Sequence, residues 1–129
     1  MIQDTCKVLG DSGCNLFSYY VCLGLDPADV LKDYDSLVKD KLILSDCTIK
    51  DYNGLAKLKG KFVDVQWAYP KDYIQDTPYI GRWERVNDKG EKIHHFVAMK
   101  NGKIIFNSMD TSRCVNEGYL VDIRRIEWK

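Results

Sequence analysis

The spacing of apolar residues changes once along this chain, close to Gly60, and that change restricts the fold more than any single motif. Before Gly60, apolar residues recur every three or four positions, as they do along one side of an α-helix. After Gly60, short apolar segments rich in β-branched and aromatic residues are separated by turn signals, which is typical of strands. The order predicts an α+β fold in which N-terminal helices pack on a C-terminal antiparallel sheet.

The ends of several elements have recognisable residue types. Gly24 follows the first helix, Asp26-Pro27 resembles an N-cap with proline at the first helical position, and Gly60 follows the third helix. Asn101-Gly102 predicts a tight hairpin turn. The expected helices span about 14–22, 27–39 and 50–59, and the expected strands 62–67, 79–86, 93–100, 103–107 and 119–128.

Two sets of side chains in these elements carry further expectations. The residues of the second helix expected to face the core are Val30, Leu31, Tyr34, Leu37 and Val38. Around the loop bracketed by two prolines, three tyrosines either line a groove or cover the sheet: Tyr69, Tyr73 and Tyr79.

Length and charge exclude several classes of protein. The 129 residues are read as a single domain, 1–129, large enough for its own core. Lysines plus arginines and aspartates plus glutamates number 19 each, without a block of like charge, so no nucleic-acid or membrane-surface partner is expected. No apolar run is long enough to cross a bilayer, and the N-terminal residues lack the regions of a signal peptide. The expected location is the cytoplasm of the cell that makes the chain.

The cysteines number five, an odd count without the spacing of a disulfide framework, so most are expected to be reduced. No metal site is expected, because the cysteines that could join the histidines in a zinc site are far apart in sequence: Cys6, Cys47 and Cys114. No cofactor is expected either.

Cys14 differs from the other cysteines in its position. It follows a Gly-Asp-Ser-Gly turn and stands at the first position of the first predicted helix. The partial positive charge of a helix N-terminus favours the thiolate, which is the nucleophilic form of cysteine. The alternative is an inert buried cysteine, the role expected for Cys22 two turns later.

Two histidines and a later polar segment follow Cys14 in the chain and could form a catalytic site with it. His94 and His95 begin a predicted strand, and Asn107 and Asp110 follow the strand that returns from it. Because strand side chains alternate, only one of the two histidines can face Cys14. Cysteine, then histidine, then an amide or carboxylate that orients the imidazole is the chain order of a papain-type site. The alternative for the polar segment is an ordinary turn.

These residues in this order resemble small papain-like cysteine peptidases. The likeness rests on Gly13-Cys14 opening a helix, His95-Phe96-Val97 opening a strand, the Asn-Gly hairpin and Phe106-Asn107-Ser108. The similar group is related to bacteriocin-processing peptidases and includes compact members carried by phages and mobile elements. The tail adds to the likeness with Asn107 to Ser112, then Val115, Gly118 and Arg124.

The resemblance implies a papain-like fold and a role for each residue. Cys14 would be the nucleophile and His95 the general base, with His94 taking that role if the register differs by one residue. Asn107 would orient the imidazole, and Asp110 is the second candidate for that position.

One feature departs from the family pattern. Papain-like enzymes have a glutamine about six residues before the cysteine as an oxyanion donor, and this chain has Val8 there. Asp11 and Ser12 are the candidate replacements, together with the N–H of Cys14. A missing oxyanion donor typically costs about 2.7–4 kcal/mol of transition-state stabilisation.

Two functions therefore follow from the sequence. The first is a cysteine hydrolase that cleaves a peptide, isopeptide or peptidoglycan-stem amide through an acyl-enzyme at Cys14, with acyl transfer as a variant. The alternative is a catalytically weak or inactive papain-fold module of phage or plasmid origin that binds a host protein or peptide. Delivery by a phage would be compatible with either function.

Overall fold

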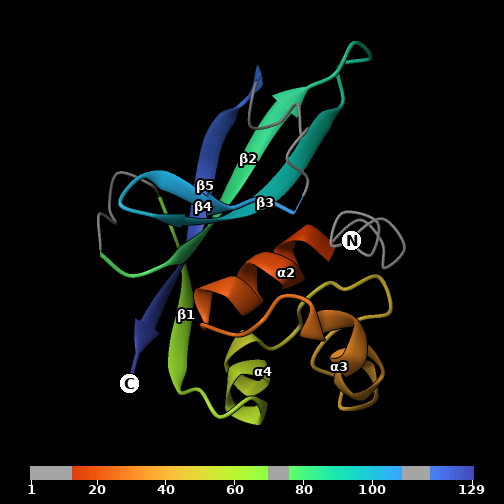
Figure 1. The fold of residues 1–129 in the computed structure, drawn as a ribbon. Helices are drawn as coiled ribbons and strands as arrows, with labels where there is room; N and C mark the ends of the chain where they lie inside the picture. The colour runs from red at the N-terminus through yellow and green to blue at the C-terminus, as the bar shows by residue number, and fades with distance from the viewer. Residues whose placement is uncertain (1–12, 70–75, 109–116) are drawn as a thin grey trace.

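A computed structural model of the chain describes residues 13–69, 76–108 and 117–129. Helices come first in the described residues and strands second, so the predicted α+β order is confirmed (Figure 1). Strands β2 and β5 have the predicted bounds at both ends. The helices are α2 (Gly13–Cys22), α3 (Asp29–Lys39) and α4 (Tyr52–Leu58), and the strands are β1 (Val63–Ala68), β2 (Tyr79–Val86), β3 (Lys92–Lys100), β4 (Lys103–Phe106) and β5 (Tyr119–Trp128).

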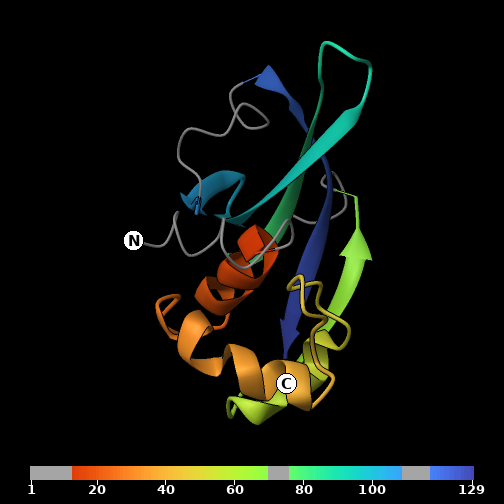
Figure 2. The same cartoon turned by 90° about the vertical axis from the view of Figure 1, so that its right-hand side faces the viewer.

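The strands form one antiparallel sheet in the order β1-β5-β2-β3-β4. The last strand of the chain, β5, therefore lies between β1 and β2, and β4 is an edge strand. Asn101 and Gly102 both have positive φ, 54° and 76°, which confirms the tight turn between β3 and β4. Figures 1 and 2 show that the β2–β3 hairpin extends beyond the helices, so the helices cover only part of the sheet.

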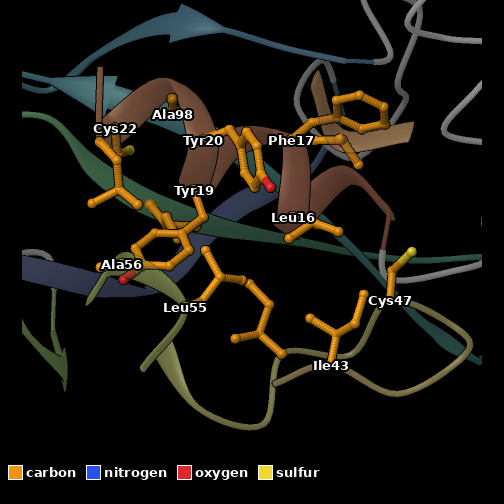
Figure 3. Close-up of a cluster of buried hydrophobic side chains, with 14 of the residues drawn as sticks. Leu16, Phe17, Tyr19, Tyr20, Cys22, Ile43, Cys47, Leu55, Ala56 and Ala98 are labelled. Carbon is orange, nitrogen blue, oxygen red and sulfur yellow. The ribbon is translucent and has the colours of Figure 1, made fainter. Parts of the chain in front are cut away.

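The core is built around α2. Nine of its ten residues are buried, and only Val21 is half-buried, as the wide apolar arc of the sequence predicted. Figure 3 shows side chains of α2 among residues of α4, β3 and the 42–50 segment. This cluster includes Ile80, Ala98 and Ile126 from one face of the sheet. A second cluster on alternate strand positions comprises Tyr79, Val97, Met99 and Ile123.

The start of α3 and the place of Leu31 differ from the expectation. The helix begins at Asp29, because Asp26 accepts a hydrogen bond from the N–H of Ala28 at 2.9 Å and closes a turn before the helix. Only Val30 and Leu37 are buried, whereas Leu31 is 57% exposed. Tyr34 and Val38 are half-buried and also pack against the core, so four of the five expected residues face it and Leu31 alone lies outside the contact.

The third helix and the tyrosines of the proline-bracketed loop are partly as expected. Asp51 caps α4 by accepting the N–H of Gly54 at 2.9 Å, and Gly60 ends this region with φ +78°. Tyr79 is 4% exposed and packs against the sheet, while Tyr69 is exposed and contacts Trp67 edge to face. Tyr73 lies outside the described residues.

Candidate functional site

Cys14 is the second residue of α2 and is buried, with 5% of its surface exposed. The N–H groups of this first turn have no acceptor within the helix, so their partial positive charge surrounds the start of α2. Cys22 lies at the other end of the same helix, where burial raises the pKa of its thiol and keeps it neutral. Cys47 is also fully buried. Among the cysteines of the described residues, Cys14 alone lies at the start of a helix.

His95 and Asn107 are brought together by the β3–β4 hairpin. The two atoms that meet are Nε2 of the imidazole and Oδ1 of the amide, 2.6 Å apart, and His95 is 6% exposed. Because the amide oxygen is an acceptor, Nε2 carries the proton in this bond. The neutral ring then keeps its basic lone pair on Nδ1. The hairpin therefore fixes the tautomer of His95 as well as its orientation.

The protonation of His95 is set by two opposing influences. Burial lowers the pKa of the imidazole, because the charged form loses its hydration, and the hydrogen bond to Asn107 raises the pKa by a smaller amount. The result is a pKa below the ordinary histidine value, so the ring is neutral near pH 7. A neutral imidazole in this tautomer is able to accept a proton.

His94 has a different environment, as the alternation along β3 predicted. Its Nε2 lies 2.8 Å from Oε1 of Glu84 on the neighbouring strand, and its side chain is 32% exposed. Glu84 also accepts a hydrogen bond from the hydroxyl of Tyr119. The Tyr119 bond, followed by the His94 bond, lowers the pKa of Glu84, so the carboxylate stays charged. His94 is thus occupied by a separate polar cluster and does not share the surroundings of His95.

Ser18, which the sequence analysis did not select, joins the helix to the strand that carries His95. Its hydroxyl lies 2.7 Å from the carbonyl oxygen of Cys14 and 3.2 Å from that of Phe96, the residue after His95. A serine one turn after Cys14 on the same helix was the available signal, since such a side chain can reach the carbonyl four residues earlier. Its contact with β3 required the tertiary structure.

Several residues that the sequence singled out lie outside the part of the chain that the structure describes. Asp11, Ser12 and Asp110 lie outside the described residues, and so do Cys6 and Cys114. Within the described ranges no group of three or more histidine, cysteine, aspartate or glutamate side chains is arranged to hold a metal ion. In the same ranges no helix is long and apolar enough to span a bilayer.

The hydrogen bond between Asn107 and His95 predicts opposite pKa shifts for two substitutions. Asn107→Asp adds a negative charge beside the ring and is expected to raise the pKa of His95, whereas Asn107→Leu removes the acceptor and is expected to lower it. The check is an NMR titration of the His95 ring, with His94 in the same spectra as the internal control. Equal His95 titrations in both variants and the wild type would contradict the 2.6 Å contact.

The chain was compared with known protein families, curated proteins and solved structures. No family model matches the chain, and neither the search of curated proteins nor the search of solved structures gives a match.

Proposed function

We propose that this chain is a papain-like cysteine hydrolase that cleaves a peptide, isopeptide or peptidoglycan-stem amide bond. The observation that carries the proposal is the partly buried hydrogen bond between His95 Nε2 and Asn107 Oδ1. It holds the imidazole in one orientation and leaves the lone pair of Nδ1 to act as the base. Further support comes from Cys14 at the start of α2 and from the contact of Ser18 with the backbone of β3 beside His95.

The chemistry follows from these positions. Nδ1 of His95 would take the proton of the Cys14 thiol, and the sulfur would attack the carbonyl carbon of the amide. The imidazolium then returns the proton to the leaving nitrogen, and the C–N bond breaks to give a thioester at Cys14. Water, deprotonated by the same imidazole, hydrolyses the thioester and releases the acid. Asn107 keeps the ring in place through both proton transfers.

Stabilisation of the oxyanion would come from backbone N–H groups at the start of α2. These groups point along the helix axis away from α2, and the helix dipole favours negative charge there. Donors of this kind act at the tetrahedral intermediate, where the carbonyl oxygen carries the charge. The arrangement would partly replace the glutamine that the family pattern places before the cysteine.

The burial of Cys14 and His95 favours the second candidate, a catalytically weak or inactive papain-fold module that binds a host protein or peptide. Cys14 and His95 expose only 5% and 6% of their surfaces, so a substrate carbonyl would have little access to the sulfur without movement of its surroundings. A buried cysteine of this kind can also serve only as core packing.

Thiol alkylation separates the two candidates. In the hydrolase, iodoacetamide is expected to modify Cys14 at least about 10-fold faster than Cys22 and Cys47, because the proposed mechanism pairs Cys14 with the base His95. The rates are measured for each cysteine by peptide mass mapping across a pH series. The urea-unfolded protein, in which all cysteines react alike, is the control. Equally slow reaction of all three buried cysteines in the folded protein would exclude the hydrolase and leave the binding module.

A further inference from the structure

Ser18 has hydrogen-bond partners on two elements that are far apart in sequence. It is fully buried in α2, one turn after Cys14, and its Oγ lies 2.7 Å from the Cys14 carbonyl oxygen. The same Oγ lies 3.2 Å from the Phe96 carbonyl oxygen, across a separation of 78 residues. A serine hydroxyl has one proton, so the two carbonyl oxygens share one donor. The contact therefore joins the carbonyl of Cys14 to the carbonyl next to His95.

The position of the Phe96 carbonyl shows how α2 approaches β3. Backbone carbonyls lie in the plane of a sheet, so the hydroxyl meets β3 along its edge. The pairing of β3 with β4 begins only at Ala98, opposite Phe106, which leaves the earlier part of β3 without a partner from β4. Ser18, in the second turn of α2, makes its contact at this part of the strand, at the residue next to His95.

We infer that Ser18 is a positioning residue that holds the start of α2, and with it Cys14, in register with the segment of β3 that carries His95. The inference rests on the proposed function, because the register matters only if the sulfur and the imidazole react together. Ser18 does not touch the reacting atoms. Its importance follows from the sensitivity of proton transfer to distance, since a displacement of about 1 Å can cost about 100-fold in rate.

The test measures the dependence of Cys14 alkylation on His95 in variants of the whole chain. Four proteins form a cycle: the wild type, Ser18→Ala, His95→Gln and the double variant. The readout is the rate constant for modification of Cys14 by iodoacetamide as a function of pH. Tyr19→Phe is the matched control, because it also removes a buried hydrogen bond of α2, the one from the Tyr19 hydroxyl to the Tyr52 carbonyl at 2.6 Å. That bond connects α2 to α4 and leaves the contact with β3 in place.

If Ser18 positions Cys14, Ser18→Ala slows alkylation about 10-fold or more in the wild-type background and has little effect once His95 is glutamine. Tyr19→Phe keeps the wild-type pH profile, and Ser18→Thr, which retains the hydroxyl, recovers most of the rate. A Ser18→Ala protein that reacts like the wild type, or one that is slowed equally in both backgrounds, overturns the inference while the hydrolase proposal stands. If His95→Gln alone changes nothing, the hydrolase proposal fails and the inference fails with it.

Discussion

Replacing Cys14 with alanine is expected to abolish the turnover of a small activated ester such as p-nitrophenyl acetate, because no acyl-enzyme can form. Replacing His95 with glutamine is expected to slow the same turnover by about 10²- to 10⁴-fold, the usual contribution of a positioned general base. Glutamine retains a hydrogen-bonding side chain, so the Asn107 amide keeps a polar neighbour. The measurement is the release of p-nitrophenolate under multiple-turnover conditions, followed by absorbance.

Two matched variants show whether these losses are specific. His94→Gln changes the adjacent histidine, whose partner is Glu84, and Cys22→Ala changes the buried thiol at the other end of α2. Both are expected to retain turnover. Because burial lowers the pKa of His95, the wild-type rate should stay constant from neutral pH down to that lowered pKa and then fall as the imidazole is protonated. Full activity in Cys14→Ala would refute catalysis by this thiol.

Replacing Asp122 with alanine is expected to reduce the free energy of unfolding by about 3 kcal/mol, the lower end of the range for breaking a buried ion pair. Asp122 is 2% exposed and accepts hydrogen bonds from Nε and Nη2 of Arg82 and from Nη1 of Arg124. Without the carboxylate, two mostly buried guanidinium groups lose their common partner. The lower end applies because the Arg82 and Arg124 side chains keep 27% and 21% exposure to water.

The loss of unfolding free energy in Asp122→Ala should become smaller at acidic pH. Burial raises the pKa of Asp122. The hydrogen bonds from Arg82, Arg124 and Trp67 together lower the pKa by a larger amount, so the folded pKa is below the unfolded one. The stabilisation is then complete above the unfolded value of about 3.9 and is lost as the pH falls through the folded value. Urea unfolding of wild type and Asp122→Ala at pH 7 and near pH 3 measures the difference.

Asp88→Ala, in the exposed β2–β3 turn, is the control for the change of net charge and should alter the free energy of unfolding by less than about 0.5 kcal/mol. A difference between wild type and Asp122→Ala that is equally large at both pH values would mean that the contribution of Asp122 is packing, with no part due to its charge.

The sequence was sufficient where a local pattern determined the structure. The Asn101-Gly102 turn joins β3 to β4, and strand alternation separates His95 from His94. The choice between Asn107 and Asp110 is open because Asp110 lies outside the described residues, although Asn107 is the side chain bonded to His95.

What the sequence did not predict depends on contacts between distant segments. Leu31 belongs to the same helical apolar pattern as Val30 and Leu37, but its exposure depends on how α3 lies against the core. Ser18 is an unremarkable serine until α2 lies against β3. The clustering of Arg82, Arg124 and Asp122 likewise needs the pairing of β2 with β5, which are separated by two other strands in sequence.

The β3–β4 hairpin has a consequence for the order in which the candidate site assembles. His95 and Asn107 are only 12 residues apart in sequence and are joined by a tight turn, so their hydrogen bond can form within microseconds of hairpin closure. Cys14 reaches this part of the chain only when α2 docks on β3, a contact that spans most of the molecule and closes slowly. In the proposed hydrolase, a refolding chain would therefore hold an oriented imidazole before the Cys14 thiol arrives, and nucleophilic reactivity would appear only with the completed fold.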